Sequence, residues 1–132
     1  MKESLKIAIA GATGYVGLEL IKILLKHPKV KIKYLFTTKS IGKSIKVFDK
    51  KIKKKLPKIS SLSKIQWNKI DLIFTALPNG EAQKIAKHIP ENVKLIDLSG
   101  DFRLNNHNLY KKYYKINHNY KNLIKKSLYS IS

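Results

Sequence analysis

The sequence predicts an α/β fold built on a doubly wound, mostly parallel sheet with helices on both faces. Two observations lead to this prediction. Short apolar runs bounded by turn residues alternate with segments whose apolar residues recur at helical spacing. The first apolar run also leads directly into a glycine-rich turn that opens a helix. Strands that alternate with helices are joined by right-handed crossovers, so neighbouring strands are expected to be parallel.

The first strand and the first helix are the clearest elements. Residues 5–10 (LKIAIA) form a short apolar run that suits a buried parallel strand. From 14 to 26 the apolar residues recur at helical spacing, and Pro28 ends this helix because the residue before a proline avoids the α region. Residues 30–36 predict a second strand, which is followed by a polar turn containing Gly42.

The rest of the chain contains one difficult segment and three clearer ones. In residues 44–69 lysines crowd the middle and a proline interrupts the pattern, which favours a solvated excursion with a short strand or two. Residues 71–77 (DLIFTAL) predict a strand, 81–88 a helix and 93–98 (VKLIDL) a further strand. Since no repeat or internal boundary is evident, residues 1–132 are expected to form one domain.

The turn after the first strand carries the main functional signal. Gly11, Gly14 and Gly17 have the spacing G-x-x-G-x-x-G, a variant of the dinucleotide-binding fingerprint. The first glycine allows a tight exit from the strand, the second lets the backbone approach a pyrophosphate, and the third lets the helix pack closely on the sheet. N–H groups at the helix N-terminus then meet the phosphate charge. We therefore predict a Rossmann-type domain that binds a nicotinamide dinucleotide; the alternative is a glycine-rich turn without a ligand.

The residues after the second strand indicate which dinucleotide is bound. NAD-selective sites commonly place Asp or Glu there, where the carboxylate accepts hydrogen bonds from the ribose 2′-hydroxyl. Here the strand is followed by Thr37, Thr38, Lys39 and Ser40, with no acid nearby. Two hydroxyls and a cation suit a 2′-phosphate better, so the sequence favours NADP. Lys39 can also be explained as one more surface lysine, so the missing acid is the stronger argument.

Arg103 is a second candidate for ligand binding, because every other one of the 28 Lys and Arg residues is lysine. A guanidinium binds anions through two parallel hydrogen bonds, which an ammonium cannot do. Arg103 lies just beyond a predicted strand, where open α/β sheets bind their ligands. It is therefore a candidate to bind an anionic substrate group such as a phosphate; the alternative is an ion pair with Asp101 or another carboxylate. The four histidines lack metal-site spacing, so no metal is expected.

Composition limits the class of protein. Apolar residues make up 43% of the chain, which argues against disorder. The absence of cysteine excludes a disulfide framework, a thiolate zinc site and a thiol nucleophile. No apolar stretch approaches the roughly 20 residues that span a bilayer, so a cytoplasmic protein without a membrane partner is expected. The net charge of +20 suits a polyanion binder, but nucleic-acid readers usually enrich arginine, so only weak, salt-sensitive binding to nucleic acid is expected.

Three segments resemble N-acetyl-γ-glutamyl-phosphate reductase, which is related to aspartate-semialdehyde dehydrogenase. Residues 11–30 resemble the opening of that family, 76–80 (ALPNG) resemble a loop that follows a strand, and 96–104 (IDLSGDFRL) look like its most distinctive segment. The resemblance covers nearly the whole chain apart from residues 44–64. It implies a reaction of arginine biosynthesis in which a cysteine thiolate attacks an acyl phosphate and phosphate leaves. NADPH then delivers hydride to the thioester and the aldehyde is released.

The resemblance also implies roles for individual residues. The residues implied in cofactor binding are Gly11, Thr13, Gly14, Tyr15, Val16 and Gly17 at the pyrophosphate, Thr37, Thr38 and Lys39 at the 2′-phosphate, and Leu77, Pro78 and Gly80 beside the cofactor. Arg103 would bind the phosphate of the substrate. The family usually has an arginine where Thr38 and Lys39 stand, which weakens the expected 2′-phosphate contact, and a histidine where Asn79 stands.

The resemblance further implies that the chain is the cofactor half of an enzyme whose full-length members are homo-oligomeric, either as a fragment of a longer gene product or as a degenerate remnant. The family's nucleophilic cysteine and its histidine partner lie further along than Ser132, so the chain alone is expected to be inactive and its catalytic domain to be missing. Two alternatives stay open. One is a related aminoadipyl-phosphate reductase or aspartate-semialdehyde dehydrogenase. The other is a dinucleotide-binding module without catalysis.

Overall fold

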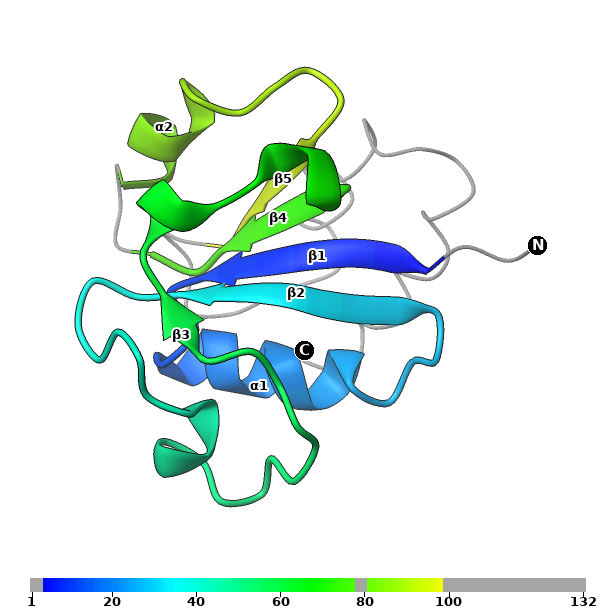
Figure 1. The fold of residues 1–132 in the computed structure, drawn as a ribbon, viewed down its shortest axis with the longest axis vertical. Helices are drawn as coiled ribbons and strands as arrows, with labels where there is room; N and C mark the ends of the chain where they lie inside the picture. The colour runs from blue at the N-terminus through cyan, green and yellow to red at the C-terminus, as the bar shows by residue number, and fades with distance from the viewer. Residues whose placement is uncertain (1–3, 78–80, 99–132) are drawn as a thin grey trace.

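The structure, a computed structural model, describes residues 4–77 and 81–98. In this part of the chain five strands form one sheet in the order β3-β2-β1-β4-β5, and every pair of neighbours is parallel (Figure 1). The strands are β1 (Leu5–Ala10), β2 (Val30–Phe36), β3 (Ile59–Ser60), β4 (Leu72–Thr75) and β5 (Lys94–Asp97). The α-helices are α1 (Tyr15–Leu24) and α2 (Glu81–Ala86). The predicted α/β fold with a parallel sheet is confirmed.

The environment of the central strand β1 explains why residues 5–10 could be predicted as a strand from the sequence. It pairs with β2 at one edge and with β4 at the other, and five of its six residues are buried. Leu5, Ile7 and Ile9 pack with the buried side chains of α1 on one face of the sheet. Ala8 and Ala10 contribute to a second apolar cluster on the opposite face. An apolar run without alternation is the expected signature of such a strand.

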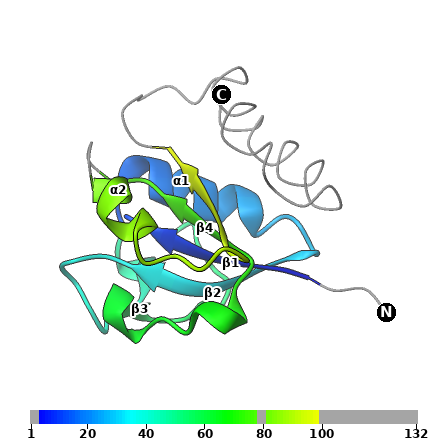
Figure 2. The same cartoon turned by 90° about the horizontal axis from the view of Figure 1, so that it is seen from above.

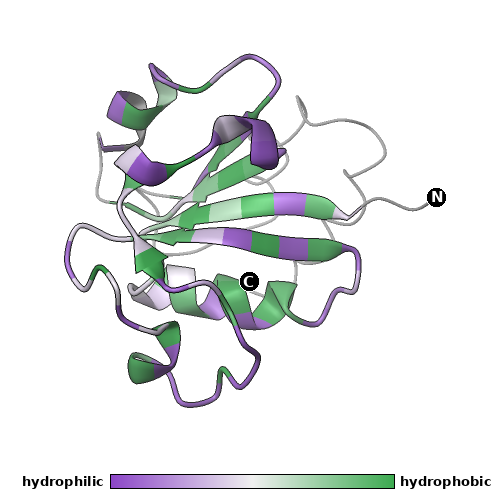
Figure 3. Ribbon diagram, viewed as in Figure 1, coloured by the Kyte–Doolittle hydropathy of each residue, from purple (hydrophilic) through white to green (hydrophobic). Residues whose placement is uncertain are grey.

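The two faces of the sheet are covered by different kinds of structure. Figure 2 shows α1 on one side and the 3-10 turns Leu62–Lys64 and Trp67–Lys69 on the other. The second apolar cluster takes partly buried side chains from these turns, including Trp67, and Ile85 from α2. Figure 3 shows that β1 is mainly hydrophobic while the 3-10 turns are mainly hydrophilic. Helices on both faces were expected, but short turns cover much of the second face.

The lysine-rich segment is anchored more firmly than its composition suggests. Ile45, Ile52 and Ile59 are buried in the same cluster as α1. Lys22 of α1 also forms an ion pair with Asp49, with 2.7 Å between Nζ and Oδ2. The lysines themselves are exposed, as a solvated excursion requires. Single isoleucines spread among lysines produce neither strand nor helix periodicity, so the sequence alone did not reveal these anchors.

Element boundaries differ from the expected ones by a few residues. The first helix ends at Leu24 rather than 26, and a turn follows in which the N–H of His27 donates to the carbonyl of Leu24 over 3.1 Å. The helix expected over 81–88 ends at Ala86. Fraying of the last turn is the usual reason for such differences. Within residues 4–77 and 81–98, no helix is both long and apolar enough to cross a membrane.

Candidate functional site

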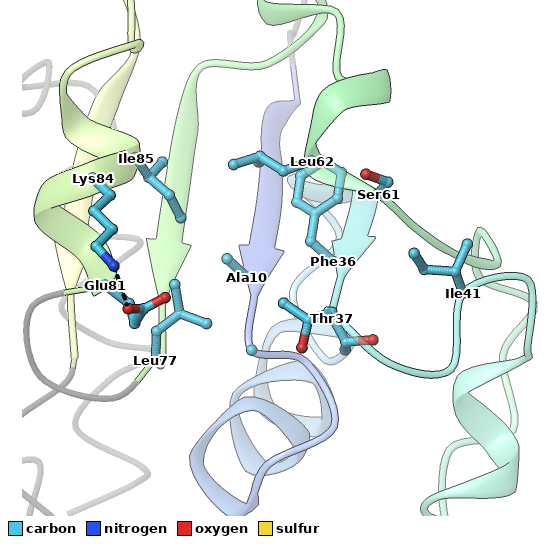
Figure 4. A pocket seen from close by; sticks show the side chains of 12 residues that line it. Ala10, Phe36, Thr37, Ile41, Ser61, Leu62, Leu77, Glu81, Lys84 and Ile85 are labelled. Atoms are coloured by element: carbon cyan, nitrogen blue, oxygen red, sulfur yellow. Dashed lines mark hydrogen bonds and ion pairs between the residues drawn. The ribbon is translucent and has the colours of Figure 1, made fainter.

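The candidate site lies where the carboxyl ends of β1, β2 and β4 meet. The chain runs from β1 to β2 on one side and later places β4 on the other side of β1, which makes this edge a topological switch point. Open α/β sheets bind ligands at such points. A pocket of about 380 Å³ opens here (Figure 4). It is lined by Ala10, Gly11, Phe36, Thr37, Thr38, Ile41, Ser61, Leu62, Leu77, Glu81, Lys84 and Ile85.

We call residues 11–17 the glycine turn, and its first glycine is required by the fold. Gly11 has a φ of +81°, which L side chains rarely adopt. A Cβ on Gly11 would lie 2.3 Å from the carbonyl oxygen of Ala76, just after β4. The N–H of Gly11 also donates to the carbonyl of Phe36 over 2.9 Å. The chain therefore leaves β1 between the ends of β2 and β4, with no room for a side chain.

The third glycine is required as well, for a different contact. A Cβ on Gly17 would lie 2.3 Å from the carbonyl oxygen of Gly11 and 2.9 Å from Cα of Ala12. Gly17 is buried in the first turn of α1. The close approach is thus between the first turn of α1 and residues 11–12, which follow β1 directly. The sequence analysis expected Gly17 to let the helix pack closely on the sheet. The result is a turn folded tightly against the start of its own helix.

The middle glycine differs from the other two because the described residues around it leave room for a side chain. Gly14 has φ −77° and ψ 170°, which any L residue can adopt. It is exposed, and among the described residues a Cβ there would meet only the carbonyl oxygen of Gly11, at 3.7 Å. Gly14 is also the N-cap of α1, and no side chain of the described residues caps this helix. The first N–H groups of α1 have no acceptor within the helix.

We call residues 37–43 the β2 loop, and it borders the other side of the pocket. Thr37 and Thr38 line the pocket, and Lys39 is exposed next to them. The hydroxyl of Thr37 donates to the carbonyl of Lys39. Ser40 has a φ of +71°, which is uncommon for a residue other than glycine. No acidic residue occurs in this loop.

The remaining walls of the pocket include residues that the sequence analysis missed. Figure 4 shows Glu81 and Lys84 of α2 side by side, with 3.1 Å between Lys84 Nζ and Glu81 Oε2. Leu62 and Ser61 approach from the segment after β3. The glutamate–lysine pair could have been found from its spacing of three residues on a predicted helix. Ser61 and Leu62 could not, because they lie in the segment without periodicity.

Next to the pocket, the ends of β4 and β5 are joined by a polar contact. Thr75 is fully buried, and its hydroxyl donates to Oδ1 of Asp97 over 3.1 Å. The N–H of Leu98 donates to the carbonyl of Thr75 over 2.7 Å. These bonds fix the direction in which the chain leaves β5. Among the described residues, no three His, Asp or Glu side chains lie close enough to hold a metal ion.

The structure brings most of the predicted site residues to one edge of the sheet. Gly11, Thr37, Thr38 and Leu77 line the pocket, whereas Lys39 lies beside it without lining it. The other predicted residues of the glycine turn follow Gly11 into α1; they are Thr13, Gly14, Tyr15, Val16 and Gly17. Pro78, Gly80 and Arg103 lie outside the described residues.

The chain is similar to known proteins along nearly its whole length. The N-acetyl-gamma-glutamyl-phosphate reductase of Ehrlichia ruminantium (strain Gardel) is 46% identical over 117 residues, which cover 86% of this chain and 34% of that protein. The protein of that name from Ehrlichia canis (strain Jake) is 41% identical over 134 residues, which cover 100% of this chain and 38% of the relative. The chain thus spans about a third of the length of these relatives.

A solved structure shows a similar arrangement of the backbone. The aspartate semialdehyde dehydrogenase of Candida albicans, in a crystal structure with NADP, has a TM-score of 0.59 and 26% sequence identity. The similarity covers 74% of this chain and 30% of that one. Residues 6–127 match the family described as "Semialdehyde dehydrogenase, NAD binding domain". Since this match includes the glycine turn, the β2 loop and, apart from Leu5, all five described strands, the chain belongs to the semialdehyde dehydrogenase NAD-binding domain family.

Proposed function

We propose that this chain is the NADP-binding domain of an N-acetyl-γ-glutamyl-phosphate reductase, an oxidoreductase of arginine biosynthesis. The observation that carries the proposal is the open position at Gly14, beside a switch-point pocket. The fold explains Gly11 and Gly17 by steric contacts, whereas the described residues leave room for a side chain at 14, so a ligand that approaches the backbone from outside would account for the glycine there. The identity of 46% to a reductase of that name supports the choice within the family.

The residues of the site fit a dinucleotide. In the proposal the N–H groups at the start of α1 donate to the pyrophosphate, and the positive end of the helix dipole favours its charge. Apolar side chains such as Leu62 and Ile85 provide a surface for the flat adenine ring. Leu77 lies where the chain leaves β4 and would border the cofactor. When bound, NADPH would supply the hydride for the reduction.

The β2 loop is proposed to select NADP over NAD. Thr38 and Lys39 are exposed just after β2, where the 2′-phosphate would lie in the proposal. The only carboxylate that lines the pocket among the described residues belongs to Glu81, and it is paired with Lys84 on α2. Residues 37–43 include no Asp or Glu that could accept a hydrogen bond from a 2′-hydroxyl, and this supports the choice of NADP.

The reaction itself is proposed only for a longer protein that includes this chain. The substrate would be N-acetyl-γ-glutamyl phosphate, reduced to N-acetylglutamate semialdehyde, and Arg103 would bind its phosphate. Such a reaction needs a nucleophile that holds the acyl group. This chain contains no cysteine, so we expect it to bind NADPH without turnover by itself.

Titration of the intact chain with NADPH and NADH, followed by nucleotide fluorescence, tests the proposal. We expect saturable binding of one equivalent of NADPH, with NADH about tenfold weaker because it lacks the charge-assisted contacts of the 2′-phosphate. The net charge of +20 makes a control for non-specific binding necessary. Inorganic pyrophosphate and heparin at about 150 mM salt serve this purpose, since screening weakens purely electrostatic binding. The proposal would be refuted if NADPH did not bind saturably. It would also be refuted if heparin displaced the bound NADPH while inorganic pyrophosphate did not.

A further inference from the structure

The pocket contains one pair of opposite charges. Among the described residues that line it, only Glu81 and Lys84 carry a charge, and both belong to α2. Their side chains form an ion pair, with 3.1 Å between Lys84 Nζ and Glu81 Oε2. Figure 4 shows the pair on the opposite side of the pocket from Thr37 and Ile41 of the β2 loop. The two charges cancel in this arrangement, so these walls of the pocket are close to neutral.

The fold itself gains little from this pair. The side chains of Lys84 and Glu81 are 77% and 47% exposed, and water screens an ion pair at such positions. The pair Glu19–Lys22 on α1 has the same spacing of three residues, but Lys22 also pairs with Asp49 and so ties α1 to the lysine-rich segment. Substitutions at Glu81 and Lys84 are therefore expected to leave the fold intact, which allows their effect on binding to be measured.

A charge in this pocket acts on any ligand group that occupies it. In a pocket of about 380 Å³ such a group lies close to both side chains, and charges interact over roughly 8 Å at physiological salt. A phosphate monoester carries about −1.5 to −2 charges near neutral pH. An unpaired carboxylate of Glu81 would repel it, whereas the ammonium of Lys84 attracts it. The balance between these two side chains thus affects how well the pocket accepts a phosphate.

Backbone hydrogen bonds fix the wall that faces this pair. The N–H of Gly11 donates to the carbonyl of Phe36 over 2.9 Å, which ties the end of β2 to the glycine turn. The N–H of Gly42 donates to the carbonyl of Ile59 over 2.7 Å, which ties the far end of the β2 loop to β3. Thr38, next to the proposed position of the 2′-phosphate, belongs to this wall. The phosphate and the pair on α2 would therefore share one pocket.

We infer that Lys84 is a specificity-determining residue for NADP because it neutralises Glu81, the one carboxylate among the described residues of the pocket. The inference rests on the proposed function and adds a second determinant of selectivity, on the wall opposite the β2 loop. Neutralisation differs from a direct contact between Lys84 and the phosphate. If Lys84 acts by neutralisation, it becomes dispensable once residue 81 is uncharged. A direct ligand would be needed in either case.

A double-mutant cycle on the intact chain separates these roles, with NADPH and NADH titrated by fluorescence at about 20 mM salt. Lys84→Met leaves Glu81 unpaired, and NADPH should bind about fivefold more weakly, the effect in water of one charge about 8 Å from a phosphate of charge about −2. NADH lacks the 2′-phosphate and should lose less. Glu81→Gln should strengthen NADPH binding by up to the same factor. The double variant should bind NADPH within about twofold of the unsubstituted chain.

Two matched controls lie outside the pocket. Lys87→Met and Glu91→Gln change the net charge by the same amounts at exposed positions that do not line it. Both should leave the preference for NADPH over NADH unchanged, and salt at about 300 mM should reduce the effect of Lys84→Met. The inference is overturned if Lys87→Met has the same effect as Lys84→Met. It is also overturned if adding Glu81→Gln to Lys84→Met restores no affinity.

The proposed function fails by a different result. If the unsubstituted chain does not bind NADPH saturably, the proposed function is refuted and the inference falls with it. If the chain binds NADPH in preference to NADH and Lys84→Met leaves that preference unchanged, the proposed function stands and only this inference fails.

Discussion

The glycine turn and the β2 loop lie at the same edge of the sheet and border one pocket, but different forces fix their backbones. At Gly11 and Gly17 the neighbouring carbonyl groups leave no space for a Cβ. The β2 loop also has two residues with positive φ, Ser40 and Gly42, but packing does not exclude a side chain at either of them. A Cβ at Gly42 would have no described neighbour within 4 Å, and Ser40 carries a side chain in its left-handed conformation. Packing determines the first region, and local hydrogen bonds determine the second.

This difference indicates how the two regions would recognise a dinucleotide. A turn built by packing presents main-chain N–H groups in a fixed arrangement, which suits the pyrophosphate common to NAD and NADP. A loop built by hydrogen bonds presents side chains, and side chains can be exchanged without disturbing the core. Binding and selectivity are thus assigned to different regions, and the following variants test that separation.

The largest expected effect is on folding of the glycine turn. Gly11→Ala and Gly17→Ala would each place a Cβ 2.3 Å from a carbonyl oxygen, so we expect the free energy of unfolding to fall by about 3 kcal/mol or more, or no folded protein to form. Urea unfolding measures this. Gly42→Ala is the matched control, because it has positive φ but free space, and it should cost only about 1–2 kcal/mol. Equal costs at Gly11 and Gly42 would show that packing does not determine the glycine turn.

The next largest effect is a loss of selectivity for NADPH over NADH, with no change in the free energy of unfolding. Lys39→Ala should weaken NADPH binding about tenfold, because one charge-assisted contact to the 2′-phosphate is lost, and leave NADH binding and unfolding unchanged. Lys43→Ala is the control, since Lys43 is equally exposed in the same loop. Fluorescence titration of both nucleotides distinguishes the two variants. Similar losses for both lysines would indicate general attraction by the positive surface instead.

A smaller effect is expected for the backbone of the β2 loop alone. Ser40→Gly removes the cost of the left-handed conformation, about 1–2 kcal/mol, but increases the entropy of the unfolded chain. We expect a net gain of about 0.5 kcal/mol in the free energy of unfolding, measured in urea. A clear loss of stability would mean that the Ser40 side chain makes a contact that the backbone argument omits.

The smallest effect concerns the ion pair that anchors the lysine-rich segment. The hydrogen bond from Lys22 lowers the pKa of Asp49, and the hydrogen bond to Asp49 raises the pKa of Lys22. The pair should therefore stabilise the fold above the ordinary carboxyl pKa of 3.8, with the contribution lost as pH falls through the lower folded value. It should also be lost as pH rises beyond the ordinary lysine value of 10.5 and through the raised one.

Asp49→Asn tests this pair. The thermal midpoint of the variant should depend less on pH at both extremes than that of the unsubstituted chain, while nucleotide binding stays unchanged because the pair is not part of the pocket. Lys43→Met removes a lysine charge without breaking the pair and serves as the control. An identical pH profile in the asparagine variant would show that Asp49 does not anchor this segment.

The same contrast explains how much could be predicted from the sequence. The bounds of β1 and β2, the parallel sheet and the glycine turn followed from apolar runs and glycine spacing, because packing imposes a strong pattern on sequence. The buried anchors Ile45 and Ile52 did not, since each is held by contacts with distant residues rather than by a repeating local structure. The pocket wall at Ser61 was missed for the same reason.

The roles of single residues in the site were predicted unevenly. The need for glycine at 11 followed from the strand-to-helix turn, and its positive φ confirms it. The role expected for Gly17, close packing of the helix on the sheet, stays a prediction, since the nearest atoms that an added Cβ would meet belong to Gly11 and Ala12. The internal hydrogen bond of Thr37 was not foreseen, since hydroxyl residues in a turn are equally consistent with binding a ligand and with bonding their own backbone.

Gly14→Ala tests the central claim most directly, with two readouts on one variant. The added methyl group has room among the described residues, but alanine is a poorer N-cap than glycine, which offsets the reduced entropy of the unfolded chain, so the free energy of unfolding should change by no more than about 1 kcal/mol. The methyl group would nevertheless occupy the path of the pyrophosphate, so NADPH and NADH should both bind about tenfold more weakly or worse. Retained affinity for both nucleotides, with normal stability, would contradict the account.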